Sequence, residues 1–231
     1  MIKVENIDVW GFEHAIRGMR NPMNSWNKSD SEYESANFCD HDFKVGENDL
    51  ELMRKLYKAG TEHRTYARMI QVSMDITAPL YWWKEMDRYT VGKSQVSCST
   101  MHKITEKEFT VDDFSHEHLI DEEIDGYECS IIDQNGIVTD INSSDMLDML
   151  VRVLNCYRDC YIKTKYKKYW WQLIQLLPSS YNQKRTVCMS YETVFKIIRE
   201  RIGHKLDEWN EFVNLLCDEL PYIRDIMQED D

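Results

Sequence analysis

The chain has 231 residues, a length typical of one domain, and 42% of them are hydrophobic, enough to build an ordinary core. Its 28 Lys and Arg and 41 Asp and Glu give a net charge of −13, which argues against non-specific nucleic-acid binding because phosphates repel such a chain. A small anionic ligand is still compatible with this charge, because a few arginines in one pocket override the global field.

The sequence also limits the compartment. No apolar run approaches the roughly 20 residues needed to span a bilayer, and the N-terminus lacks the pattern of a signal peptide. We therefore expect a cytoplasmic protein that does not contact membranes. The seven cysteines, an odd number, are expected to be free thiols or small core residues.

The first half of the chain combines strand and loop patterns. Aliphatic residues in a roughly alternating pattern predict a strand over residues 2–10. Residues 18–45 are rich in Asn, Ser, Asp and Gly and predict a long loop, a feature that is usually functional or mobile in a compact domain. Asn48 followed by Glu51 resembles a capping box that opens a helix over residues 48–58.

The clearest strand lies at residues 70–77, where apolar and polar residues alternate strictly. Pro79 fits the first turn of a helix, which we extend to Tyr89. The next segment, residues 92–100, is small, polar and rich in hydrogen-bond donors, and we interpret it as a loop.

The second half of the chain is predicted to be mainly helical. Residues 112–140 form an acidic excursion that we expect to be solvated. Apolar residues at helical spacing then predict helices over 144–163, 166–177, 191–202 and 206–220. We therefore expect a single domain over residues 1–231, of the α/β (α+β) class, with a mobile loop at 18–45 and an acidic excursion at 112–140.

Common catalytic motifs are absent, and the pair His116 and His118 is only a weak metal signal, so we expect no metal site. The informative stretch runs from Glu62 to Lys103: a histidine-containing loop, the alternating strand, an Ala-Pro helix start, Arg88 and a serine-rich loop. This order resembles the flavin-dependent thymidylate synthases, in which the helix delivers an Arg-His-Arg motif.

The resemblance extends from Gly46 to Leu220, without the acidic excursion. Leu177-Pro178 resembles the Leu-Pro that follows a helix in the family, and Arg201, His204 and Trp209 resemble residues of its last core helices. The resemblance implies a central, mostly antiparallel sheet with several long helices. It also implies a homotetramer whose sites are shared between subunits.

The resemblance implies a set of flavin-contacting positions. His63 matches the family's flavin-contacting histidine loop, which also contains Thr65. The flavin-binding Asn and Arg of the family fall near Ser190 and Glu192, so that a carboxylate stands where the family has an arginine.

A second set of positions is expected to hold the nucleotide. Arg88 matches the first arginine of Arg-His-Arg, whereas Tyr89 and Thr90 replace the other two residues. Arg201 matches the arginine that approaches the nucleotide. Strict spacing puts Cys98 at the position of the nucleotide-binding serine, so we expect Ser97 or Ser99 to take the role of that serine. Lys184 and Arg185 would add positive charge for a phosphate.

Three functions follow as alternatives. By resemblance, the chain is an enzyme that methylates deoxyuridylate (dUMP), with FAD as cofactor and methylenetetrahydrofolate and NADPH as co-substrates, where the flavin and folate carry the chemistry. The replaced motif positions favour a lapsed homologue that binds, senses or sequesters a nucleotide or a nucleotide-derived signal. The third alternative is an interaction protein that contacts its partner through residues 18–45.

Each candidate residue also has an ordinary structural interpretation. Arg88 fits a helix end whose carbonyl groups it would face, and Arg201 fits the polar edge of its helix. His63 fits a surface loop, and the two serines fit hydrogen bonds to loop backbone. The sequence leaves these interpretations open beside the functional ones.

Overall fold

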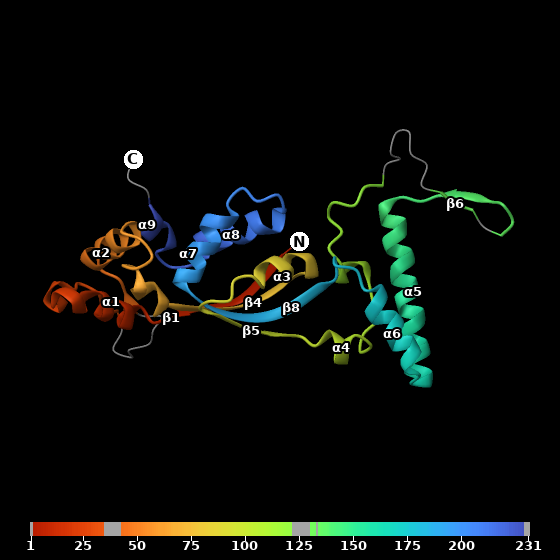
Figure 1. Cartoon of the computed structure of the whole chain (residues 1–231), viewed down its shortest axis with the longest axis horizontal. Helices are drawn as coiled ribbons and strands as arrows, with labels where there is room; N and C mark the ends of the chain where they lie inside the picture. Colours follow the sequence, from red (N-terminus) through yellow and green to blue (C-terminus); the bar gives the residue numbers. More distant parts are fainter. Residues whose placement is uncertain (1, 35–42, 122–129, 133, 229–231) are drawn as a thin grey trace. The chain divides into compact units, whose positions relative to one another are not determined.

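The centre of the fold is a four-stranded sheet with several helices around it (Figure 1). The computed structural model describes residues 2–34, 43–121, 130–132 and 134–228. The sheet contains, in spatial order, β1 (Lys3–Trp10), β4 (Gln71–Pro79), β8 (Asn182–Ser190) and β5 (Lys93–Ser97). β1 pairs with β4 and β5 pairs with β8, both antiparallel. The expected mixed fold with a central antiparallel sheet is confirmed.

The remaining elements of the described residues are two small sheets and a set of helices. Two small sheets pair β2 (Glu32–Tyr33) with β3 (Phe43–Lys44) and β6 (Ser130–Ile132) with β7 (Val138–Asp140). The helices are α1 (Phe12–Arg20), α2 (Glu47–Lys58), α3 (Leu80–Met86), α4 (Thr100–Lys103), α5 (Ser143–Thr164), α6 (Lys167–Leu176), α7 (Tyr191–Arg201), α8 (Asp207–Glu219) and α9 (Ile223–Met227). Among the described residues, no helix has the length and apolar character to cross a membrane.

The strand β4 follows from its sequence pattern. Its apolar residues Val72, Met74 and Ile76 are fully buried, whereas the alternating polar residues are only partly buried. On the polar face, the Asp75 carboxylate accepts hydrogen bonds from Asn6 (2.9 Å) and Thr186 (2.6 Å) of the two neighbouring strands. The alternation that predicted this strand therefore also identifies its buried face correctly.

Several elements differ from the expectations. Pro79 is the last residue of β4 and not the first turn of a helix, and α3 ends at Met86 instead of Tyr89. The first N–H groups after Pro79, those of Leu80 and Tyr81, donate to the carbonyls of Tyr181 and Ser179, both at 3.0 Å. The segment 92–100, expected as a loop, forms β5 and the start of α4, because it pairs with β8. The sequence did not predict α1, β8 or α9.

The N-terminus of α2 does not use the expected capping box. The N-cap residue is Gly46, and the Asp30 carboxylate accepts the N–H groups of Asn48 (2.9 Å) and Asp49 (3.2 Å). A Cβ atom on Gly46 would clash with this carboxylate, so a side chain at this position would displace the cap. The cap thus comes from a remote residue, which local spacing could not indicate.

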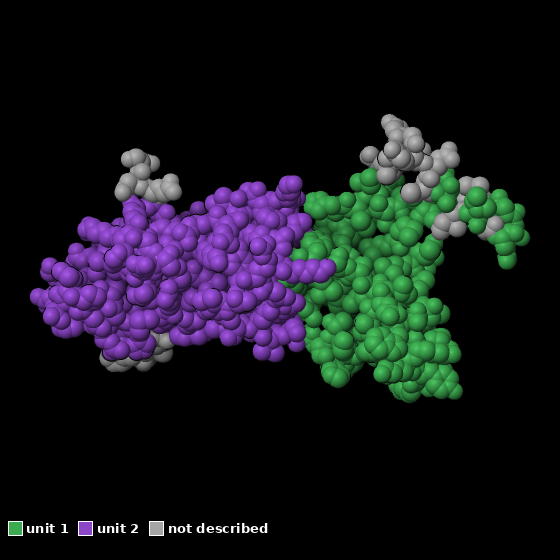
Figure 2. All heavy atoms as spheres, in the orientation of Figure 1, with its two compact units in different colours: residues 1, 78–83, 98–183 green, residues 2–77, 84–97, 184–231 purple. Residues whose placement is uncertain are grey.

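Contacts divide the chain into two compact units, coloured separately in Figure 2. Unit 1 contains residues 78–83 and 98–183, and unit 2 contains residues 2–77, 84–97 and 184–231. Parts of two segments singled out in the sequence, residues 35–42 and residues 122–129 with 133, lie outside the described residues. The described part of residues 18–45 holds the end of α1, two short 3-10 helices, β2 and β3.

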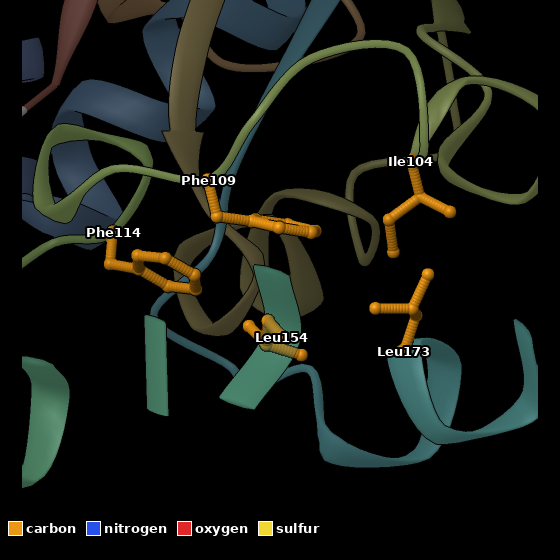
Figure 3. Close-up of a cluster of buried hydrophobic side chains, with 5 residues drawn as sticks. All are labelled: Ile104, Phe109, Phe114, Leu154 and Leu173. Carbon is orange, nitrogen blue, oxygen red and sulfur yellow. The ribbon is translucent and has the colours of Figure 1, made fainter. Parts of the chain in front are cut away.

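Each unit has its own buried side chains. In unit 1, α5 and α6 pack on a small apolar cluster in which the Ile104 and Leu173 side chains point toward each other (Figure 3). The cluster consists of Ile104, Phe109, Phe114, Leu154 and Leu173. Unit 2 has the larger core, built on the buried face of β4 and on aromatic side chains of α7 and α8 such as Phe195 and Phe212. Two of the candidate residues, Ser190 and Arg201, are buried in unit 2.

Candidate functional site

Apart from Ser99, the candidate nucleotide-binding residues lie at the end of α3, on β5 and β8 and at the end of α7, in the parts of these elements that belong to unit 2. Amphipathic packing of α7 buries Val194, Phe195 and Ile198 and places Arg201 in its last turn. The segment 84–89 carries three charged or phenolic side chains toward this region: Glu85, Asp87 and Tyr89.

Arg201 is buried in a cage of side chains. It is only 8% exposed, and its Nε–H donates to the Tyr89 hydroxyl at 2.9 Å. Its Nη1 forms an ion pair with the Glu85 carboxylate. The guanidinium carbon lies 4.5 Å from the centre of the Trp209 ring, a cation–π contact. The residue that was expected to approach a nucleotide is therefore held by partners of its own chain.

Glu85 and Tyr89 complete this cage. The Tyr89 hydroxyl donates to the Glu200 carboxylate at 3.0 Å while it accepts from Arg201. Burial raises the pKa of Tyr89, so the phenol stays neutral at physiological pH. The Nδ1 atom of His204 accepts the Leu206 N–H, and its Nε2 lies 3.1 Å from Arg201 Nη1 and 3.4 Å from the Glu85 carboxylate. The polar side chains around Arg201 thus have partners within unit 2.

A second ion-pair cluster surrounds Asp87. Its Oδ1 atom accepts from Arg185 Nη1 at 2.7 Å and from Gln95 Nε2 at 2.6 Å. Lys93 Nζ donates to the Met86 carbonyl at 2.7 Å, and burial lowers the pKa of this lysine. Ser97 pairs with Arg185 across β5 and β8, and its side chain is exposed. The structure therefore brings Ser97 and Arg185 together, with a carboxylate beside the arginine.

Lys184 lies on the polar face of the sheet. Its Nζ is 3.1 Å from Asp75 and 3.7 Å from Glu5. Hydrogen bonds from Thr186, Asn6 and Lys184 lower the pKa of Asp75 to about 2, so the carboxylate is ionised at physiological pH. The ammonium group of Lys184 thus lies between two carboxylates.

Two nucleotide candidates remain, Arg88 and Ser99. Arg88 follows α3, and its side chain is exposed, as are those of Thr90 and Cys98. Ser99 belongs to unit 1, where its hydroxyl caps α4 by accepting the His102 N–H at 3.3 Å. The contacts of Ser99 therefore support a structural role, hydrogen bonding to the backbone.

The flavin candidates lie at the loop before β4 and the start of α7. His63 and Thr65 are exposed, and Thr65 begins a 3-10 helix (Thr65–Arg68). Ser190 is buried and is the N-cap of α7, where its hydroxyl accepts the Thr193 N–H at 3.4 Å. The Gly92 carbonyl accepts the Ser190 N–H at 2.8 Å. Both polar groups of Ser190 therefore have internal partners.

Glu192 forms an ion pair that the sequence did not reveal. Its carboxylate accepts from Arg64 Nε at 2.8 Å, and the Arg64 side chain is 2% exposed. The Arg64 guanidinium also donates to Thr61 (3.1 Å) and lies 5.1 Å from the Tyr57 ring centre. No sequence signal pointed to this pair, because its two residues come from distant segments.

These contacts test whether a flavin fits the positions that the resemblance implies. A flavin dinucleotide carries a pyrophosphate, which requires arginine or free N–H donors. Here the hydroxyl of Ser190 caps a helix, and a carboxylate, Glu192, stands at the arginine position with its own internal partner. At these two positions, a flavin pyrophosphate would find neither the arginine of the family nor an unpaired hydroxyl. Within the described ranges, no group of three or more metal-ligating side chains occurs either.

Comparisons with known proteins identify the fold. No family model and no curated protein matches the sequence. The structure is similar to that of flavin dependent thymidylate synthase ThyX from Helicobacter pylori complexed with FAD and dUMP, with a TM-score of 0.62 and 14% identity. That similarity covers 99% of this chain and 97% of the other. A second structure of that enzyme with FAD and dUMP gives a TM-score of 0.61 at 14% identity, covering 99% and 96%.

A UMP/dUMP methylase, PolB from Streptomyces cacaoi, bound with 5-Br dUMP, is more distant. Its TM-score is 0.49 at 15% identity, and the match covers 86% of this chain and 77% of that one. For the two Helicobacter structures, in contrast, the structural alignment covers almost the whole length of both chains. The chain therefore has the fold of the flavin-dependent thymidylate synthases, as its sequence resemblance predicted.

Proposed function

We propose that this chain binds a uracil nucleotide through the fold of the flavin-dependent thymidylate synthases and has lost flavin-dependent methylation. The observation that carries the loss of the family's chemistry is the ion pair between Arg201 and Glu85. A phosphate that approached the Arg201 guanidinium would also meet the Glu85 carboxylate at a similar distance. The repulsion from one would largely offset the attraction to the other.

The pair of Arg64 and Glu192 supports the loss of flavin chemistry in the same way. Arg64 follows His63 directly in the histidine loop and is buried, and Glu192 already neutralises it. A flavin pyrophosphate at this place would have to displace Glu192 and leave a carboxylate without a partner, which is costly in a buried position.

The exposed groups at the end of α3 and on β5 support retained nucleotide binding. Arg88 and Ser97 have exposed side chains. Arginine binds phosphate through paired N–H donors, and a serine hydroxyl suits the polar edge of a pyrimidine. The two Helicobacter neighbours of the same fold hold dUMP. We assign the phosphate to Arg88.

Two measurements test the proposal. The purified protein should be colourless, and added FAD should leave its visible spectrum unchanged. The midpoint of thermal unfolding should rise with dUMP, because a ligand that binds only the folded state stabilises it. Arg88→Ala should weaken dUMP binding about tenfold, whereas Arg152→Ala, an exposed arginine of α5 in unit 1, should not. A protein that ignores dUMP would refute the proposal.

The alternative is the complete reaction, methylation of dUMP with FAD, methylenetetrahydrofolate and NADPH. Coverage of nearly the whole length of enzymes that hold FAD and dUMP favours it. A flavin absorption band that changes when dUMP is added would support this alternative over the first. The homotetramer and the cytoplasmic location stay predictions, which sedimentation velocity and microscopy of the tagged chain would check.

A further inference from the structure

Unit 2 contains a large cavity that takes no part in the function proposed above. It has a volume of about 820 Å³ and is lined by residues of α2, α7, α8 and α9 and of the turn after α2. α2, α7 and α9 lie near one another in Figure 1. None of the residues assigned to the nucleotide lines this cavity. Pockets of roughly 300–1,000 Å³ commonly hold small organic ligands.

The lining is basic although the protein is acidic. The chain has 41 acidic and 28 basic residues, yet among the described residues that line the cavity four are basic and none is Asp or Glu. The four are Lys58, Arg64, Arg199 and Arg224. Arg64 and Arg224 are paired with acids outside the lining, so the attraction for an anion comes chiefly from Arg199.

Two of these arginines form ion pairs with acids that do not line the cavity. Arg64 is bonded to Glu192 and Thr61, and Arg224 is bonded to Asp218, and neither acid lines the cavity. Arg64 is only 2% exposed, and both arginines are already paired with a carboxylate, so neither offers an uncompensated charge to a ligand. Arg199, on α7, has an exposed side chain, which makes it readily accessible to a ligand.

The rest of the wall is largely apolar. Ile198 and Ile223 are buried beneath it, whereas Ile202 is 70% exposed and offers an uncovered aliphatic surface beside the cations. The Cys217 thiol also lines the cavity, and burial raises its pKa, so it adds no negative charge. The cavity thus combines cationic donors with an aliphatic surface.

We propose that this cavity binds an organic phosphate with an apolar body, its phosphate on Arg199 and its body against Ile202. Arginine prefers phosphate because planar pairs of N–H donors match its oxygens. The aliphatic wall then selects an esterified phosphate over the free ion, because burial of apolar surface adds to affinity.

Two probes separate the two halves of the site. The fluorescent dye 8-anilinonaphthalene-1-sulfonate combines an anionic group with an apolar body, and inorganic pyrophosphate supplies only the anion. Arg199→Glu should weaken binding of both at least about tenfold, since it removes one charge-assisted hydrogen bond and adds repulsion. Ile202→Ser should weaken the dye alone, by up to about tenfold.

Lys196→Glu is the matched control, because it makes the same charge change on α7 at an exposed residue outside the cavity. It should change the affinity for either probe by less than about twofold. Unfolding midpoints of all variants are recorded first, so that a loss of binding is compared only between folded proteins. Equal losses in Lys196→Glu and Arg199→Glu, or full binding by Arg199→Glu, would overturn the assignment.

The same variants separate this site from the uracil nucleotide site. Arg199→Glu should keep the thermal shift with dUMP, and Arg88→Ala should keep dye and pyrophosphate binding. If the wild-type protein ignores dUMP but loses dye binding in Arg199→Glu, the cavity assignment holds and the function proposed above fails. Loss of the dUMP response and of dye binding together in Arg199→Glu would contradict two separate sites.

Discussion

Arg64 and Glu192 are 128 positions apart in the sequence, yet they form a 2.8 Å ion pair that joins the loop before β4 to the first turn of α7. The arginine side chain is almost completely buried and the glutamate is 17% exposed. The pair therefore fixes the two segments that the resemblance assigns to the flavin, and it has direct consequences for stability.

Removal of one partner of this pair should cost more than removal of both. Glu192→Ala leaves a buried guanidinium without its carboxylate and should lower the free energy of unfolding by about 3 kcal/mol. The double variant Arg64→Ala/Glu192→Ala removes both charges and should recover part of that loss. Urea denaturation of the two single variants and the double variant measures this coupling. Strictly additive losses would show that the two charges do not interact.

Gly92 should resist substitution for a steric reason. Its φ is +67°, and a Cβ atom there would lie 2.7 Å from the Ser190 hydroxyl oxygen. Gly92→Ala should therefore destabilise the protein by about 2 kcal/mol or more, from backbone strain and from displacement of the α7 cap.

Gly203 provides the matched control for that experiment. Its φ of +68° is nearly the same, but a methyl group on this residue would have no neighbouring atom within 4 Å among the described residues. Gly203→Ala should cost only the backbone strain of about 1 kcal/mol. The difference between the two thermal midpoints measures the contact with Ser190, and equal midpoints would contradict that contact.

The buried carboxylate of Asp49 should be essential for the segment before α2. It is fully buried and accepts hydrogen bonds from Arg20 (2.5 Å), Ser29 (2.6 Å) and Ser31 (2.6 Å). Burial opposes its ionisation, but these hydrogen bonds prevail and lower the pKa of Asp49. Asp49→Ala should reduce stability by about 3–5 kcal/mol, since it leaves the buried Arg20 without its carboxylate.

Limited proteolysis and urea denaturation together check this expectation. The variant should be cleaved faster near residues 29–31 than the wild type, because those residues lose their acceptor. Asp148→Ala, an exposed aspartate of α5, serves as control and should behave like the wild type. Wild-type stability in Asp49→Ala would contradict the structural role of the carboxylate.

Asp75 should give the protein part of its acid sensitivity. Its pKa is lowered to about 2 in the folded state from a usual value of 3.8. A lowered folded-state pKa contributes stability above the unfolded-state value, and this contribution disappears as the pH falls from about 4 to about 2. In Asp75→Asn, the free energy of unfolding should therefore decrease less over that pH range than it does in the wild type. The urea midpoint, measured between pH 5 and pH 2 in both proteins, tests this, and parallel curves would exclude Asp75 as a source.

The sequence predicted those elements whose burial follows a simple period. β4 alternates strictly, and α5, α7 and α8 carry apolar stripes, so their positions agree with the structure. The sequence did not predict β8, because its first five residues, from Asn182 to Thr186, are polar and only its last part is buried. The sequence did not predict β5 for a similar reason: four of its five residues are exposed, and only its pairing with β8 defines it as a strand.

The candidate site was only partly predictable. The resemblance drew attention to Arg201 and Ser190, but their partners could not be inferred from spacing. Glu85 lies 116 positions from Arg201, and only the folded chain brings them together. Contacts of this kind are decided by tertiary packing, which leaves no local pattern in the sequence.

The remote cap on α2 links the folding of two segments. Because Asp30 accepts the N–H groups of Asn48 and Asp49, the first turn of α2 is complete only when residues 29–31 are docked. The amide protons of Asn48 and Asp49 should then exchange with solvent at a rate set by undocking of that segment and not by fraying of the helix alone. The N-terminal segment and α2 thus form one cooperative unit, and a truncation that removes Asp30 would leave the helix without its start.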